Sequence, residues 1–187
     1  MAGAYEWVNR LVEATGWREP PSPCDWTVTE TAFGTSFPGD YKEMCDRFGP
    51  GDFCLLVLAR PDWGPQPFIT ALGGEGHGRE ALLGWRGAFT GSHELLTPHC
   101  DYADNGTSGL ILWGLSDWGR YFWLADATQD PESWPVLAKT GNRPGSDDPW
   151  HRFDMGVPEL LYRILTGDPA ADPFEVDASK TRPAFAR

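Results

Sequence analysis

The pattern of hydrophobic residues is densest in the middle of the chain, where two apolar and aromatic runs flank a turn-forming segment. These runs are Leu110–Trp113 and Tyr121–Leu124, and the connection between them is Gly114–Arg120, which is rich in glycine and small polar residues. Two such runs across a glycine-containing connection are typical of a β-hairpin. Neither run alternates between apolar and polar residues, so the pattern predicts two central strands that are covered on both faces by helices.

Four other segments have apolar residues at the spacing that places them on one face of a helix. They are residues 4–15, residues 26–33, the segment between Pro38 and Gly49, and residues 157–165. A glycine directly follows each of the first three segments, which is a common signal for the end of a helix. A proline begins the third segment, which is a common signal for the start of a helix. The sequence therefore predicts three helices before the hairpin and one after it, and Glu80–Trp85 also looks helical.

The remaining apolar runs predict the other strands. Residues 53–59 indicate a buried strand, and residues 94–100 and 134–138 indicate two more; residues 68–72 fit either a strand or a helical turn. The order of helices, then strands, then a helix predicts the α+β class. We expect an antiparallel or mixed sheet of about five to six strands, flanked by N-terminal and C-terminal helices.

Composition and charge limit the functions that this chain can have. It has 187 residues and a formal net charge of −12, and no apolar run of membrane-spanning length or signal peptide is visible. This charge argues against nucleic acids and anionic membrane surfaces as partners, and it suits a basic protein partner. We expect a cytoplasmic protein without a small-molecule substrate.

Half of the negative charge lies in residues 92–135, which contain seven acidic residues and one basic residue and so carry −6. Trp118 lies in the expected turn, where a bulky aromatic side chain has little reason to be buried, whereas Trp113, Trp123 and Trp134 suit the core. An exposed tryptophan beside carboxylates is a plausible anchor for a protein partner. The predicted partner-binding residues are Asp101, Asp104, Asp117, Trp118, Asp126 and Asp130.

The search for catalytic chemistry yields little. His93, His99, Cys100 and Asp101, with His77, are ligand types that suit zinc, but their spacing matches no close ligand pair on one helix. The carboxylates of Glu94, Asp101 and Asp104 suit an acid/base pair only if the fold brings them together, and surface positions are their default. The four cysteines show no paired spacing and are interpreted as small buried hydrophobic residues. The sequence predicts no enzyme, no cofactor and no metal site.

Aromatic, glycine and proline residues recur in a characteristic order along most of the chain. They are Trp26, Glu30, Phe33-Gly34-Thr35, Phe37-Pro38, Asp40-Tyr41-Lys42, Phe48-Gly49-Pro50-Gly51 and Phe53, then Gly109-Leu110, Trp113-Gly114, Gly119, Phe122-Trp123, Asp130-Pro131 and Trp134-Pro135-Val136, and finally Trp150, Phe153, Leu160-Leu161, Leu165 and Gly167. This pattern resembles the SUKH superfamily, which includes bacterial immunity proteins and a fungal regulator of cell-wall synthesis. The match runs from about Trp26 to Gly167, and Phe33 and Phe37 stand where leucine is more usual in the family.

The resemblance implies an α+β domain with a concave groove and no catalytic residues. It divides the chain into an N-terminal helix with a proline-rich linker (1–23), a SUKH-like domain (24–167) and a flexible C-terminal tail (168–187). Many members are implied to neutralise toxins, often nucleases, by direct binding, and the family does not fix the interface at matched positions. We therefore expect an immunity protein that binds a basic, nuclease-type toxin.

Two other functions stay open at this stage. The first is a regulatory protein-interaction module linked to cell-wall synthesis or cell division, which would use the same groove on another partner. The second is a small hydrolase that uses the cluster from His93 to Asp101, and stoichiometric zinc in the purified protein would favour it. Salt separates the two binding functions, because binding that depends on charge weakens steeply as salt rises.

Overall fold

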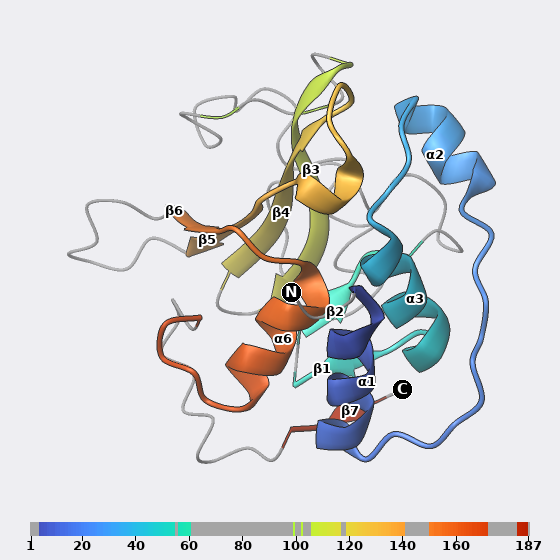
Figure 1. The fold of residues 1–187 in the computed structure, drawn as a ribbon, viewed down its shortest axis with the longest axis vertical. Coiled ribbons are helices and arrows are strands. Elements are labelled where there is room, and N and C mark those ends of the chain that lie inside the picture. The colour runs from blue at the N-terminus through green and yellow to red at the C-terminus, as the bar shows by residue number, and fades with distance from the viewer. Residues whose placement is uncertain are drawn as a thin grey trace.

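The computed structural model describes residues 4–54, 56–60, 99, 102, 106–116, 119–140, 150–171 and 183–186. In this part of the chain the α-helices are α1 (Ala4–Thr15), α2 (Thr27–Phe33), α3 (Gly39–Phe48) and α6 (Val157–Leu165), and a short 3-10 helix, η5, spans Pro131–Ser133. The strands are β1 (Asp52–Phe53), β2 (Leu56–Leu58), β3 (Ser108–Ser116), β4 (Gly119–Asp126), β5 (Val136–Thr140), β6 (Trp150–Phe153) and β7 (Phe185–Ala186). Figure 1 shows their arrangement.

These strands form one antiparallel sheet in the order β6-β5-β4-β3-β2-β1-β7. The β3–β4 hairpin is its centre, with Ser108 paired to Asp126 at one end and Ser116 paired to Gly119 at the other. β5 pairs with β4, and β6 pairs with β5 and forms one edge of the sheet. The C-terminal strand β7 forms the other edge by pairing with β1.

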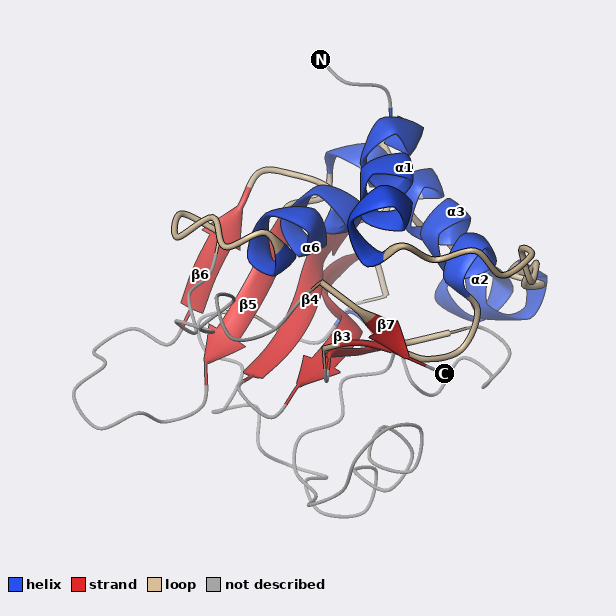
Figure 2. Cartoon of the chain, turned by 90° about the horizontal axis from the view of Figure 1, so that it is seen from below, coloured by secondary structure: helices blue, strands red, loops and turns tan. Residues whose placement is uncertain are grey.

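The helices lie together on one face of the sheet (Figure 2). Tyr41 on α3 is completely buried there, and its ring meets the ring of Trp123 on β4 edge to face at 4.7 Å. The Tyr41 hydroxyl group donates to the carbonyl oxygen of Ala59 at 2.7 Å and lies 2.9 Å from the carbonyl oxygen of Trp113. Because a buried hydroxyl group needs a partner, these contacts fix α3 against the junction of β2 and β3.

The second face of the sheet is also buried. Leu110, Leu112 and Phe122 are fully inaccessible to solvent, and Leu137 is 2 % exposed. They alternate along their strands with residues that pack under the helices, so they point the other way. The prediction that the central strands are covered on both faces is confirmed, but the helices that the structure describes all lie on the first face. None of these helices has the length and apolar character needed to cross a bilayer.

The α+β class and the helix bounds agree closely with the sequence. Helices over 4–15 and 157–165 were expected at these bounds, and α2 begins one residue later than expected. Gly34, which follows α2, has φ of 65°, the left-handed conformation that favours glycine, and its N–H donates to the carbonyl oxygen of Thr31. Trp113, Trp123 and Trp134 are all buried, as predicted.

The described residues form seven strands, which differs from the expected five to six. Four of them, β3 to β6, have four residues or more, and three short ones (β1, β2 and β7) extend the sheet on one side. The segments expected over residues 68–72 and 80–85, and all of residues 94–100 except His99, lie outside the described residues. The single strand expected over residues 53–59 is instead split into β1 and β2, which form a tight hairpin with Phe53 opposite Leu56. Cys54 has a positive φ of 51° at this point, so the backbone reverses direction where the apolar run gave no signal.

The central hairpin is longer than expected. Residues 114–116 and 119–120, which were assigned to the connection, continue the two strands, and only residues 117–118 lie between the paired positions Ser116 and Gly119. The pairing shifts its register between Leu112 and Gly114, which marks a β-bulge. Gly114, which was expected in the turn, therefore lies at a β-bulge within β3, because the pairing with β4 continues beyond it.

Both ends of the chain add to this structure. Val8 and Leu11 of α1 are completely buried in the core, and the ring of Trp7 packs on Tyr162 of α6 at 5.5 Å. At the other end, Phe185 of β7 packs at 4.8 Å against Phe53. Segments that the sequence assigned to a separate helix and to a flexible tail thus contain residues that pack on the central domain.

Candidate functional site

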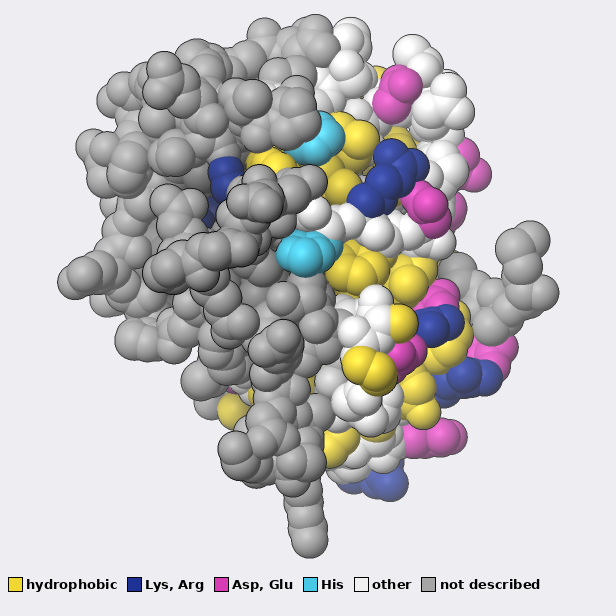
Figure 3. Space-filling view, turned by 90° about the vertical axis from the view of Figure 1, so that its left-hand side faces the viewer, with side chains coloured by type: hydrophobic (Ala, Val, Ile, Leu, Met, Phe, Trp, Pro, Cys, Tyr) yellow, Lys and Arg dark blue, Asp and Glu magenta, His cyan; other side chains and the backbone are white. Residues whose placement is uncertain are grey.

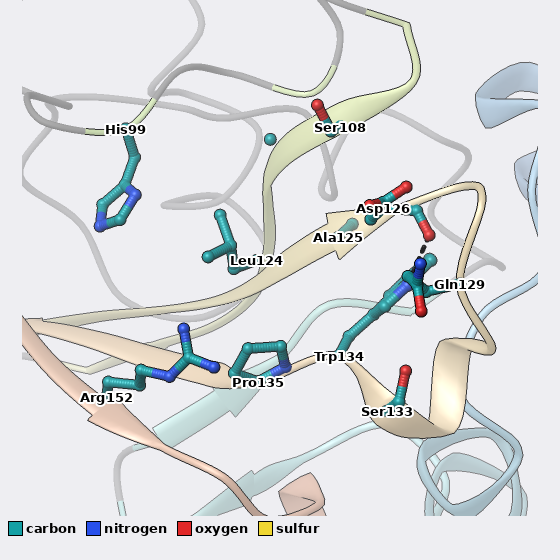
Figure 4. Close-up of a pocket in the computed structure, with 11 residues that line it drawn as sticks. His99, Ser108, Leu124, Ala125, Asp126, Gln129, Ser133, Trp134, Pro135 and Arg152 are labelled. Atoms are coloured by element: carbon teal, nitrogen blue, oxygen red, sulfur yellow. Dashed lines mark hydrogen bonds between the residues drawn. The ribbon is translucent and has the colours of Figure 1, made fainter.

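A pocket of about 430 Å³ lies where β3 begins, β4 ends and η5 ends. It has the size of many ligand sites. Figure 4 shows Asp126, Gln129 and Ser133 at one end of it, Leu124 and Pro135 in the middle, and His99 and Arg152 at the other end. We call the segment Asp126–Ser133 the acidic corner, because it has three acidic residues and no basic residue.

Asp126 is the last residue of β4 and the first of the acidic corner. Its Oδ1 accepts hydrogen bonds from the Thr128 hydroxyl group at 2.6 Å and from the Thr128 backbone N–H at 2.9 Å. These two bonds, the side-chain bond first, hold the pKa of the Asp126 carboxyl group below its ordinary value. Asp126 is therefore a fixed negative charge at neutral pH, on the border between the pocket and the surface.

The other two carboxylates of the acidic corner are also held by hydrogen bonds from the backbone. Asp130 is exposed and caps η5, where its Oδ1 accepts from the N–H of Glu132 at 3.1 Å. Glu132 accepts a hydrogen bond from the N–H of Gly39 at the start of α3. Backbone N–H groups thus hold all three carboxylates, two of them within the corner and one from α3. Thr128, Gln129 and Ser133, between and beside these carboxylates, are exposed.

Trp134 forms the wall behind the acidic corner. It is 4 % exposed, and its Nε1–H donates to the backbone carbonyl oxygen of Asp126 at 3.0 Å (Figure 4). The backbone N–H of Leu124 donates to the carbonyl oxygen of Pro135 at 2.9 Å, which brings the middle of the pocket against the chain that leads into β5. The corner is therefore a rigid extension of the central hairpin.

The opposite end of the pocket is basic. Arg152 on β6 is exposed, its Nε donates to Asp154 Oδ1 at 2.9 Å, and Figure 4 shows its guanidinium group pointing towards Pro135. The imidazole ring of His99 meets the ring of Trp150 edge to face at 5.0 Å. Figure 3 shows this side of the molecule, where hydrophobic side chains lie next to histidine and basic side chains, with acidic side chains nearby. The pocket thus has charges of opposite sign at its two ends.

More basic groups follow on the second face of the sheet. Arg120 and Lys139 are directly paired across β4 and β5. Burial, and then the charge of Arg120, lower the pKa of Lys139, whose Nζ lies 4.9 Å from the ring centre of Trp150. The surface of this acidic protein is therefore not uniformly negative, and the acidic corner stands apart from a basic and aromatic region.

An unusual carboxyl group lies beneath the acidic corner. Asp40, in the first turn of α3, is 7 % exposed, and its Oδ1 has no hydrogen-bond partner among the described residues. Burial, and then the charge of Glu132, raise the pKa of Asp40 to about 7. Gly156 lies so close that a Cβ atom there would stand 2.1 Å from Asp40 Oδ2. The Asp40 carboxyl group can therefore gain or lose a proton near neutral pH. It faces Gly156 at the start of α6 and does not line the pocket.

The structure brings together two of the six predicted binding residues, Asp126 and Asp130. The other four (Asp101, Asp104, Asp117 and Trp118) lie outside the described residues. Of the zinc candidates only His99 is described, and no group of three potential metal ligands occurs in the part of the chain that the structure describes. The proposed acid/base carboxylates Glu94, Asp101 and Asp104 also lie outside it.

Sequence reasoning did not identify Arg152 or Gln129 as site residues. Arg152 comes from β6, and it reaches the pocket only because β6 pairs with β5 and β5 with β4. Gln129 lies between the two predicted acids and has no feature of its own in the sequence. Comparison of the chain with protein-family models, with curated proteins and with solved structures gives no match.

Proposed function

We propose that the protein is a non-enzymatic protein-binding domain that binds and neutralises a basic, nuclease-type toxin in the cytoplasm. Two sequence observations support this, the resemblance of residues 26–167 to SUKH immunity proteins and the net charge of −12. A basic nuclease has a cationic groove for phosphate groups, and an acidic protein competes for that groove by placing carboxylates where phosphates bind.

The observation that carries the proposal is the acidic corner. Asp126, Asp130 and Glu132 present three carboxylates within seven residues, and each is held by a hydrogen bond from the backbone. Side chains that are already ordered lose less conformational entropy on binding than free ones. The acidic corner therefore offers fixed negative charges in a rigid frame, which favours both rapid association and specific contact with a basic surface.

The test uses a purified basic nuclease domain encoded next to the gene for this protein. We expect direct binding, inhibition of the nuclease, and an affinity that falls steeply between low and high salt, because exposed charges are screened within about 8 Å at physiological ionic strength. The double variant Asp126→Asn, Asp130→Asn should bind at least about tenfold more weakly, a loss of about 1.4 kcal/mol. Asparagine keeps an acceptor oxygen for each local bond, so the change removes charge and preserves the turns.

The matched control is the double variant Glu13→Gln, Glu19→Gln. These exposed glutamates lie at the end of α1 and just after it, away from the pocket, and the substitution changes the net charge by the same amount. Equal losses for the two double variants would show that only the overall charge matters and would remove the acidic corner from the interface. Binding that is absent at low salt would refute neutralisation itself.

The alternative is a regulatory interaction module linked to cell-wall synthesis or cell division. The basic and aromatic region around Trp150, Lys139 and Arg152 favours it, because a partner bound there need not be basic. A pull-down from cell lysate at low and high salt separates the two functions. Capture of envelope or division proteins that is insensitive to salt, and unchanged by loss of Asp126 and Asp130, would support the alternative.

A further inference from the structure

The pocket beside the acidic corner has a polarity that indicates what fits into it. At one end lies Asp126, whose Oδ1 is occupied by Thr128; its Oδ2 accepts no hydrogen bond from the described residues. Gln129 and Ser133 line the same end. A carboxylate that stays ionised, with an oxygen directed away from its local bonds, is a strong acceptor for an ammonium or guanidinium group.

The middle of the pocket is apolar. Leu124 and Pro135 lie between its two ends in Figure 4, and Trp134 is the aromatic residue beside them. An aliphatic stem of three or four methylene groups suits such a surface, because lysine and arginine bury their stems along apolar residues while their charged heads seek polar partners. The acidic end and the apolar middle together match one long basic side chain.

The opposite end carries donors. The guanidinium group of Arg152 points towards Pro135, and its Nε donates to Asp154. β6 and β4 are separated by β5, so their backbones lie about 10 Å apart at the usual spacing of paired strands. A residue whose side-chain cation lies at Asp126 therefore directs its main chain towards Arg152 and His99, where a carbonyl oxygen finds donors.

From this geometry we infer that the pocket receives one arginine or lysine residue of the protein partner. Its cation binds Asp126, its stem lies on Leu124 and Pro135, and its main-chain carbonyl group faces Arg152. This inference rests on the proposed function, because it names the contact through which a basic partner is held. Residues that fill a pocket in this way are often the ones that dominate the energy of an interface.

The experiment needs no toxin. Binding of Nα-acetyl-arginine methylamide is followed by ¹H–¹⁵N NMR through the indole N–H of Trp134, which lines the pocket and is assigned with Trp134→Phe. We expect saturable shifts with a dissociation constant on the order of 1–10 mM, as befits a single residue. Nα-acetyl-norleucine methylamide, which has a similar stem and no cation, is the matched ligand and should bind at least about fivefold more weakly.

Two variants test the two ends separately. Asp126→Asn should weaken binding of the arginine probe about fivefold or more and should leave the norleucine probe unaffected, whereas Glu13→Gln should change neither. Arg152→Met should also weaken the arginine probe, because it keeps an unbranched stem and removes the donors for the carbonyl group. Tighter binding by Arg152→Met would mean that Arg152 only repels the cation, and that result overturns the assignment of the main chain.

The outcomes distinguish this inference from the proposed function. If neither probe shifts the Trp134 signal at about 10 mM, or if norleucine binds as well as arginine, the pocket does not take a basic residue. That result does not decide whether the protein neutralises a toxin, which is tested separately by the nuclease-binding experiment above. If the arginine probe binds as expected and no basic nuclease binds, the inference about the pocket holds and the proposed neutralisation of a toxin is refuted.

Discussion

Replacement of Asp40 by asparagine tests whether a buried carboxyl group weakens the fold at neutral pH. Asp40 is almost completely buried, and burial followed by the charge of Glu132 raises its pKa from 3.8 to about 7. The folded protein therefore holds this proton much more tightly than the unfolded chain does. Above its pKa, the folded state must bury a negative charge beside Glu132.

The magnitude follows from the two pKa values, which differ by about 3. At 1.36 kcal/mol per pKa unit, the group costs the folded state about 4 kcal/mol once it is ionised. Because the pKa of Asp40 is raised in the folded state, this group makes folding less favourable as the pH rises. The cost that Asp40 adds is absent below pH 3.8, grows as the pH rises towards 7, and changes little above that.

Urea denaturation of the wild type and Asp40→Asn at pH 4, 5, 6, 7 and 8, followed by tryptophan fluorescence, measures this cost. The asparagine amide stays neutral and has its own cost of burial, so the informative quantity is the difference in unfolding free energy between the two proteins. We expect this difference to move by about 3–4 kcal/mol in favour of asparagine between pH 4 and pH 8. Contributions from other acidic groups are common to both proteins and largely cancel.

Glu132→Gln provides the control for the cause. Glutamine keeps an acceptor for the N–H of Gly39 and removes the charge, so the pKa of Asp40 should fall and the pH dependence should become shallower without vanishing, since burial is the larger cause. A difference between wild type and Asp40→Asn that stays constant within about 0.5 kcal/mol from pH 4 to pH 8 would refute the reasoning, because the carboxyl group would then be ionised at the same pH in both states.

Three further predictions concern the core. Tyr41→Phe should lower the free energy of unfolding by about 1–3 kcal/mol in urea denaturation, because it leaves a buried carbonyl oxygen without its donor; an unchanged midpoint would contradict this. Gly156→Ala should cost about 1–3 kcal/mol by clashing with Asp40, and Asp40→Ala should relieve most of that cost in a double-mutant cycle. In native protein, iodoacetamide should label Cys54 and spare Cys45, which is buried and whose pKa is raised by burial; rapid labelling of Cys45, mapped by mass spectrometry, would show that the core opens.

The helices could be predicted from sequence because their signals are local. Helix α6 has apolar residues at helical spacing and a proline in its first turn, and α2 and α3 have glycine directly behind them. These features act within one or two turns of chain, and packing on the sheet does not oppose them. The same holds for the two apolar runs of the central hairpin, which the structure places side by side.

The strand limits could not be predicted because they depend on partners that are distant in the chain. β1 and β2 are separate strands because Cys54 adopts a positive φ, and β1 is completed by β7 from the other end of the protein. Gly114 looks like a turn residue in isolation, yet it pairs with Tyr121 past a bulge. In each case a hydrogen-bonded neighbour decides the backbone conformation, and the local sequence does not contain that information.

The candidate site was predictable only in its acidic half. Asp126 and Asp130 lie four residues apart just before Pro131, so the sequence already indicates that their carboxylates share one short segment. Arg152 and His99 belong to other segments, and only the pairing of β6 with β5 brings Arg152 to the same pocket. The charge pattern along the chain indicates an acidic surface at Asp126 and Asp130. The positive charge of Arg152 at the other end of the pocket depends on the order of strands in the sheet, which the charge pattern does not show.

The topology also limits how the predicted acidic segment works. Ser116 pairs with Gly119 at one end of the hairpin, whereas Asp126 ends β4 at the other. The eight residues of β4 extend over about 23–26 Å, which is longer than the screening length of about 8 Å. A partner that used both ends would have to span the whole hairpin, while a partner held at the acidic corner needs only one end. For this reason the substitutions that test the proposed function are placed at Asp126 and Asp130 together.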